Sequence, residues 1–124
     1  MSISDYLELK LLDAVFNSTS FVVTGDPWVS LHTADPGETG TSECTGGSYV
    51  RKQVPFNPAA SGALDNAAAI VWASMPACTV AGAGIWDAET TGNFLWGGLV
   101  TPNKTLNAGD TFQINAGDLD VALD

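Results

Sequence analysis

The chain has 124 residues, of which 45% are hydrophobic, and 14 acidic against four basic side chains give it a formal net charge of −10. This length predicts one domain over residues 1–124, long enough to bury a real core. The charge argues against nucleic-acid binding, which needs clustered Lys and Arg, because only Arg51 and Lys52 are adjacent. A membrane span is not expected either, since the longest apolar stretch, residues 67–73, is far shorter than the roughly 20 residues that a spanning helix needs.

Residues 4–16 are predicted to form the one helix of the chain, an amphipathic helix at its N-terminal end. Ser4 is a good N-cap, and Asp5 and Glu8 favour the positive end of the helix dipole. One apolar face would consist of Leu7, Leu11, Ala14 and Val15. Residues 1–20 are therefore expected to be a helix and its connector.

Further apolar residues widen this helix surface beyond one stripe. Such a helix must pack on its own sheet or on a neighbouring subunit, so we expect it to provide a surface for assembly. The candidate residues of that surface are Tyr6, Leu9, Leu12 and Phe16.

After residue 20 the spacing of apolar residues changes to the alternation that is typical of strands. Thirteen glycines and six prolines favour many short strands separated by turns. About seven strands are predicted, at residues 28–33, 48–54, 68–73, 79–87, 94–100, 111–115 and 119–123. Residues 57–66, which are small and polar, are expected to form a loop. The predicted fold class is mainly β: an antiparallel β-sandwich, jelly-roll-like, over residues 21–124.

Residues 28–37 combine a strand with a turn. Ser30 and His32 share one strand face, and the strand ends at an Asp-Pro-Gly turn formed by Asp35, Pro36 and Gly37. Ser, His and Asp are the residue types of a nucleophilic triad. Side chains two residues apart on a strand stand parallel, however, at Cα separations of roughly 6.5 to 7 Å. We therefore expect a hydrogen-bonded histidine and no catalytic residue.

The two cysteines of the chain, Cys44 and Cys78, lie in a Thr/Ser/Gly loop and at the start of an apolar run. Two unpaired thiols, one of them buried, are the favoured interpretation. A disulfide within the chain or between subunits is the alternative, and it would form only after release from a reducing compartment. With a single histidine, the chain has too few ligands for a zinc site, and no metal or cofactor is expected.

The aromatic residues raise the question of sugar binding, since flat rings stack on sugars. Most of them alternate with polar residues in strands, where packing in the core is the commoner role. They are Trp28, Tyr49, Trp72, Trp86 and Trp96. A carbohydrate-binding β-sandwich remains an alternative function.

Five segments in order along the chain resemble small structural proteins of tailed phages. These segments are residues 9–16, 29–37, 46–51, 83–88 and 117–124. The motif that contributes most comprises Leu31, His32, Thr33, Asp35, Pro36 and Gly37. The resemblance implies a non-enzymatic, β-rich protein of the virion, made in the host cytoplasm.

Within that resemblance the role is open between the head and the tail of the particle. A small domain without a shaft favours a capsid decoration, or cement, protein that assembles as a symmetric oligomer such as a trimer. Its partners would be further copies of itself and the major capsid protein or other virion proteins. The alternative is a tail or tail-fibre component that contacts the host surface.

Overall fold

The computed structural model describes residues 2–123, and this part of the chain contains one helix and nine strands. The helix is α1 (Asp5–Phe16). The strands are β1 (Ser2–Ile3), β2 (Trp28–His32), β3 (Lys52–Gln53), β4 (Ala63–Asp65), β5 (Ile70–Trp72), β6 (Cys78–Trp86), β7 (Phe94–Leu106), β8 (Phe112–Ile114) and β9 (Asp120–Ala122). No helix among these residues is long and apolar enough to cross a membrane.

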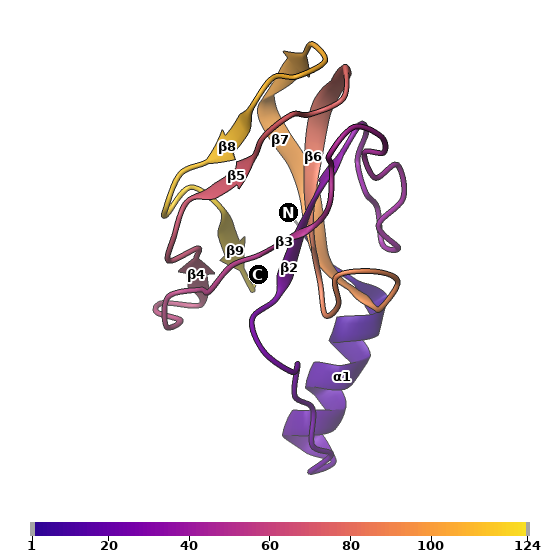
Figure 1. Cartoon of the computed structure of the whole chain (residues 1–124). Helices are drawn as coiled ribbons and strands as arrows, with labels where there is room; N and C mark the ends of the chain where they lie inside the picture. The colour runs from indigo at the N-terminus through magenta and orange to yellow at the C-terminus, as the bar shows by residue number, and fades with distance from the viewer. Residues whose placement is uncertain (1, 124) are drawn as a thin grey trace.

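The strands form one large and two small antiparallel sheets. The large sheet has the order β1-β7-β6-β2-β3, and its centre is the long β6–β7 hairpin. The two small sheets, β4–β9 and β5–β8, have two strands each and lie on one side of the large sheet (Figure 1). The result is a sandwich-like arrangement of two unequal layers.

The main core lies between these layers. The inner face of β2 contributes Val29 and Leu31, which have no exposed surface. Other fully or almost fully buried members are Trp72, Met75, Val80, Ala83, Leu106 and Leu119. The apolar positions of the strands therefore face inward, as their alternation along the sequence indicates.

A mainly β fold with antiparallel sheets and a single N-terminal helix is thus confirmed. Each of the seven predicted strand segments contains a strand, but β1 and β4 were not predicted. Strand β4 lies in the segment expected to be a loop, residues 57–66, where it pairs with β9. The three residues of β4 are extended because they pair with a strand far along the chain, and the local sequence does not reveal that pairing.

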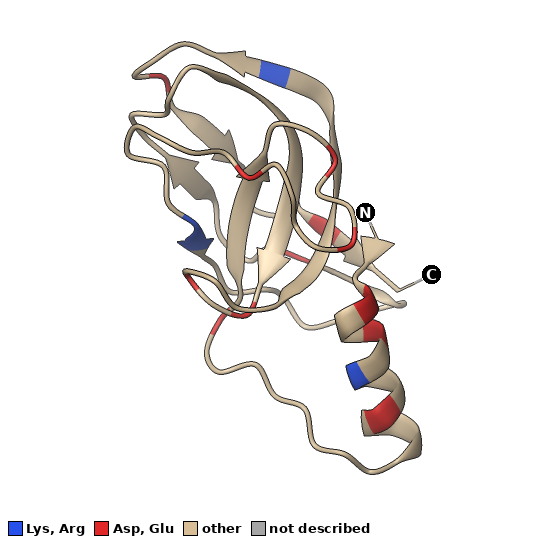
Figure 2. Ribbon diagram, turned by 90° about the vertical axis from the view of Figure 1, so that its right-hand side faces the viewer, with Lys and Arg blue, Asp and Glu red and all other residues tan. Residues whose placement is uncertain are grey.

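Helix α1 begins and ends where the sequence predicts. The side chain of Ser4 accepts a hydrogen bond from the backbone N–H of Leu7, and Asn17 closes the last turn by donating to the carbonyl of Asp13. Ser4 also donates its hydroxyl to the carbonyl of Phe94 in β7. The start of the helix is therefore fixed to the large sheet, while its C-terminal end extends away from it (Figures 1 and 2).

Candidate functional site

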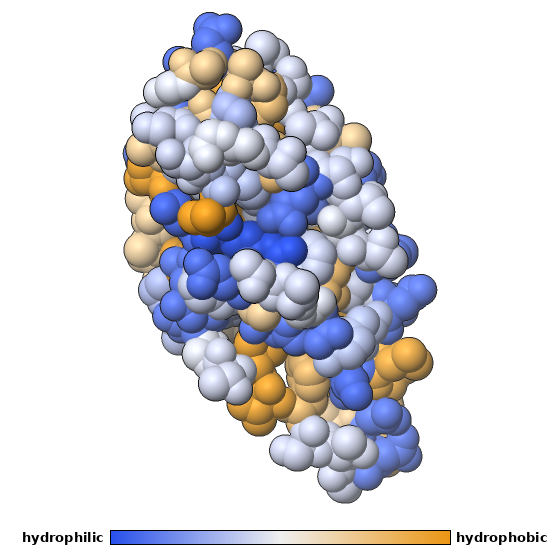
Figure 3. Space-filling model, turned by 45° about the vertical axis from the view of Figure 1, so that its right-hand side comes forward, coloured by the Kyte–Doolittle hydropathy of each residue, from blue (hydrophilic) through white to orange (hydrophobic). Residues whose placement is uncertain are grey.

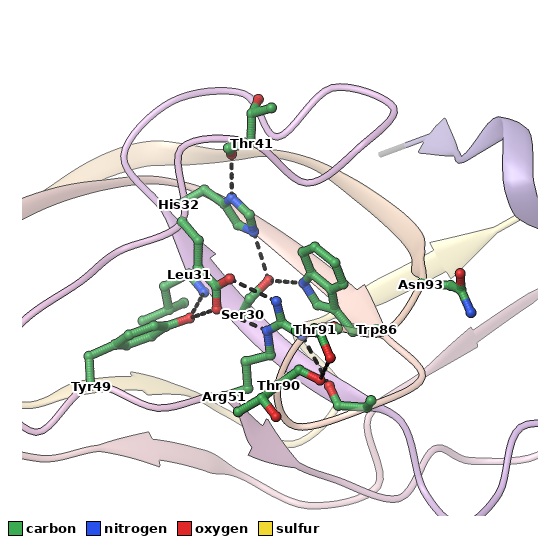
Figure 4. A network of polar contacts seen from close by, with 12 residues as sticks. Ser30, Leu31, His32, Thr41, Tyr49, Arg51, Trp86, Thr90, Thr91 and Asn93 are labelled. Atoms are coloured by element: carbon green, nitrogen blue, oxygen red, sulfur yellow. Dashed lines mark hydrogen bonds and ion pairs between the residues drawn. The ribbon is translucent and has the colours of Figure 1, made fainter.

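A chain of buried hydrogen bonds lies on the outer face of β2 (Figure 4). Trp86 donates its indole N–H to Ser30 Oγ at 2.8 Å, and Ser30 Oγ is 2.7 Å from His32 Nε2. His32 Nδ1 lies 2.7 Å from the carbonyl oxygen of Thr41. Because a carbonyl can only accept, Nδ1 carries the proton and Nε2 accepts from the Ser30 hydroxyl. Burial lowers the pKa of His32 below its ordinary value of 6.5, which favours this neutral form.

The convergence of Ser30 and His32 corrects the expectation that their side chains stand apart. The imidazole lies back along the strand toward Ser30, and Gly84 in the neighbouring strand β6 leaves the space for both. A Cβ atom at Gly84 would lie 2.7 Å from Ser30 Oγ and 2.9 Å from His32 Nε2. The glycines of β6 were the sequence signal that could have indicated this close packing.

The hydrogen bond between Ser30 and His32 has the geometry of a nucleophile and its base. The surroundings of the pair, however, fit a role in holding the loop that follows β2. Ser30 and His32 have no exposed surface, so a substrate cannot reach the hydroxyl. Asp35 does not complete a triad: its carboxylate accepts from the N–H of Gly37 in the predicted turn, and Thr41 takes the place beside Nδ1. These bonds hold the loop that follows β2 against the sheet.

A second polar cluster fixes the far end of the same loop. The guanidinium of Arg51 makes a two-pronged contact with the Glu43 carboxylate, at 3.0 Å from Nε and 2.9 Å from the terminal nitrogen. Burial raises the pKa of Glu43, but the hydrogen bonds from Arg51 and Tyr49 outweigh it and hold this pKa below its ordinary value. Glu43 is therefore ionised at neutral pH.

Arg51 joins three parts of the chain. Its guanidinium stacks on the Trp86 ring at 3.6 Å from the ring centre. It also donates to the carbonyls of Ala88 and Thr91, in the turn between β6 and β7. The sequence showed Arg51 only as one of two adjacent cations, and nothing local indicated that it is buried.

Tyr49 connects the two clusters. Its hydroxyl donates to Glu43 at 2.9 Å and accepts from the backbone N–H of Leu31 at 3.0 Å. Burial raises the pKa of this phenol, so the group stays protonated and able to donate. We name this set the loop anchor: Ser30, His32, Glu43, Tyr49, Arg51 and Trp86.

The structure brings the two cysteines together. Cys44 lies beside β2, to which its N–H donates, and its side chain is buried in the core. Cys78 opens β6 and is partly exposed. The two sulfur atoms are 3.9 Å apart, and both are present as free thiols.

Helix α1 carries two apolar faces, and neither is fully buried. Leu7 and Leu11 face the β layers across a groove and, like Ala14, are half-buried, whereas Val15 is 72% exposed and does not belong to that face. Tyr6, a candidate for the assembly surface, is half-buried and packs edge-on against Phe21 of the connector.

Among residues 2–123, no contact covers the opposite face of the helix. Its apolar side chains are more than half exposed, and Figure 3 shows hydrophobic side chains at the surface in the lower half of the molecule. We name this set the outer helix face: Leu9, Leu12, Val15 and Phe16.

An apolar groove of about 470 Å³ separates α1 from the β4–β9 sheet. This groove explains why the inward residues of the helix are only half-buried. Leu7 and Leu11 line it from the helix, and Phe56, Trp96 and Val121 line it from the β layers.

Three of the four tryptophans are buried and present no free ring to a sugar. Trp72, Trp86 and Trp96 have exposed fractions of 1%, 8% and 5%. These three rings therefore cannot stack on a sugar and do not support carbohydrate binding. Within residues 2–123 no group of three or more His, Cys, Asp or Glu side chains is placed to hold a metal ion.

An antiparallel β framework whose longest loop is anchored by buried polar bonds, with an uncovered apolar helix face, is typical of a structural protein that assembles with others. The comparison with protein families identifies the kind of protein. The chain belongs to the family described as Podophage GP4 fiber I protein gp80, whose model matches residues 2–122. This match confirms a phage virion structural protein, and it does not test the motif at residues 31–37. No curated protein matches the chain.

Proposed function

We propose that this protein is a non-enzymatic subunit of a phage tail fibre. The observation that carries the proposal is the family match over residues 2–122, because the family is described as a fibre protein. This description supports the tail-fibre alternative better than the capsid decoration role that the sequence analysis favoured. The burial of the Ser30 and His32 pair supports a role without catalysis.

The outer helix face supports self-association as the mode of assembly. Leu9, Leu12 and Phe16 recur at spacings of three and four residues, which places them in one row on the helix. The exposed fractions of these side chains are 64%, 54% and 77%. Packing this row against a second copy would remove a large apolar surface from water, which stabilises association by about 25 cal/mol for each Å².

Charge sets a condition on this contact. Asp5, Glu8 and Asp13 lie on the same exposed half of the helix as the apolar row. In a symmetric contact these carboxylates of two copies approach one another, and their repulsion opposes the apolar attraction. The proposed assembly therefore needs salt, or a geometry that keeps the acids at the rim.

The location is tested by counting copies of the protein in purified virions by quantitative mass spectrometry. A fibre subunit is expected at a few to about two dozen copies per particle, in multiples set by tail symmetry. On the order of hundreds of copies, in proportion to the major capsid protein, would instead establish capsid decoration. Absence from the particle would contradict both roles.

The contact is tested by sedimentation of the purified protein over a range of concentrations. Leu12→Gln is expected to weaken self-association at least about tenfold, because it places an amide in an apolar contact. Leu99→Gln is the matched control, since Leu99 is equally exposed, at 57%, but lies on β7. Equal association of the two variants would contradict the assignment to the helix.

A further inference from the structure

Cys44 and Cys78 lie side by side in the structure, whether or not the protein belongs to a fibre. The residues are 34 positions apart in sequence, yet their sulfur atoms are 3.9 Å apart. A disulfide needs about 2.05 Å between the sulfur atoms. Closing the pair therefore requires a movement of about 1 Å by each side chain, and no segment has to refold.

The backbone around both cysteines is already held in place by other contacts. The N–H of Ser48 donates to the carbonyl of Ser74, which joins the loop after Cys44 to the segment before β6. Gly47 lies against Pro76 so closely that a Cβ atom there would be 3.0 Å from the proline nitrogen. The thiols are thus presented to each other by the fold, independently of any bond between them.

The location of the protein supplies the change in conditions. Virion proteins are made in a reducing host cytoplasm and leave it when the particle is released. In the reducing cytoplasm two neighbouring thiols stay reduced, whereas outside the cell they can be oxidised to a disulfide. We propose that Cys44 and Cys78 form an intrachain disulfide after release, which ties the anchored loop to the start of β6.

The reaction is a thiol–disulfide exchange with a small-molecule disulfide such as oxidised glutathione. The partly exposed Cys78 attacks as its thiolate, forms a mixed disulfide and releases one reduced thiol. Cys44 then attacks the Cys78 sulfur, the protein disulfide forms, and the second reduced thiol leaves. In all, the protein loses two protons and two electrons, and the reagent disulfide takes them up to become two reduced thiols.

Burial and the neighbouring Cys78 raise the pKa of Cys44 to about 12. The second step needs the Cys44 thiolate, and burial still raises the pKa of Cys44 when Cys78 is in the mixed disulfide, so the rate of closure is expected to keep rising with pH above about pH 8.5, where exposed thiols level off. This dependence distinguishes closure inside the core from reaction of two exposed thiols.

The experiment treats the reduced full-length protein with oxidised glutathione and follows intact mass, non-reducing electrophoresis and thermal unfolding. The expected product is a monomer lighter by two hydrogen atoms, with a melting temperature raised by about 10 °C. The variants Cys44→Ala and Cys78→Ala serve as controls, and neither should show the shift. If Cys44→Ala fails to fold, Cys78→Ala still serves as the control, because Cys78 is partly exposed and its replacement disturbs the core less.

Two results would overturn the proposal. One is a linked dimer on the non-reducing gel, which would place the bond between chains. The other is full alkylation of both cysteines after oxidation, which would show that the thiols remain free.

Discussion

At the scale of single residues, the loop anchor depends on protonation states that burial fixes. His32 is neutral because its ring is desolvated and because Ser30 and Thr41 fill both of its nitrogen positions. The unfolded chain takes up a proton near pH 6.5, whereas the folded chain does so only at lower pH. Stability from this residue is therefore complete above pH 6.5 and is lost as the pH falls through the folded pKa.

This argument predicts the pH dependence of unfolding. Below pH 6.5 the free energy of unfolding should fall by up to about 1.4 kcal/mol for each pH unit. Urea denaturation at several values between about pH 5.5 and 7.5 measures it. His32→Asn should be less stable overall but flat over this range, since His32 is the only histidine. A wild-type protein that is equally flat would contradict the assignment.

Arg51 gives a second prediction at this scale. Arg51→Met leaves the Glu43 carboxylate without its cation and two turn carbonyls without donors, so it should cost about 2–4 kcal/mol of stability. Arg51→Lys keeps the charge but loses the two-pronged contact, and should restore only part of that loss. Chemical denaturation compares both with Lys104→Met, an exposed cation, which should change stability by less than about 0.5 kcal/mol.

The sequence revealed only part of this site. The turn at residues 35–37 follows from local chemistry, and its Asx hydrogen bond is present. The partnership of Glu43, Tyr49 and Arg51 depends on how the loop folds back over β2 and β6, which no local pattern encodes. The same holds for the contact of the two cysteines, which depends on the pairing of distant strands.

At the scale of elements, α1 is stabilised mainly at its first turn. No residue of the helix itself is buried, and a helix of 12 residues is marginal in water on its own. Ser4 is 1% exposed and both caps the helix and bonds to Phe94. The helix boundaries were predictable because capping is local, whereas the outward position of Val15 was not, since it depends on where the sheets lie.

This arrangement predicts a large effect of one hydroxyl group. Ser4→Ala removes the cap and a buried bond to β7, and should lower the free energy of unfolding by about 2 kcal/mol. It should also speed hydrogen exchange of the amides in α1. Ser20→Ala, an exposed serine of the connector, is the control. Equal exchange in the two variants would show that the helix is held by other contacts.

At the scale of the whole molecule, the excess of acidic side chains dominates. They are spread over the loops, the helix and the short strands, whereas the few cations are confined to Lys10 on the helix, the adjacent Arg51 and Lys52, and Lys104 on β7 (Figure 2). With a net charge of −10, the folded chain repels itself more than the expanded chain does. The positions of most strands and their antiparallel arrangement were predictable at this scale, but the order of strands in the large sheet and the separation of the second layer into two small sheets were not.

The repulsion predicts that salt stabilises the fold. Raising NaCl from about 0.02 to 0.5 M should raise the melting temperature by a few degrees, because screening weakens repulsion between exposed charges. Differential scanning calorimetry at neutral pH measures this. The same series near the isoelectric point, about pH 4.1, is the control and should show almost no effect. A similar rise at both pH values would point to a general salt effect.

The attachment of β1 and Ser4 to β7 has a mechanical consequence. Ser2 and Ile3 pair with Gly97 and Trp96, and the N–H of Ser4 donates to the carbonyl of Leu95. A pulling force that enters through α1 therefore passes at once into the second strand of the large sheet. This route does not pass through the connector at residues 17–27. A subunit built in this way can bear tension along its helix without unravelling from that loop.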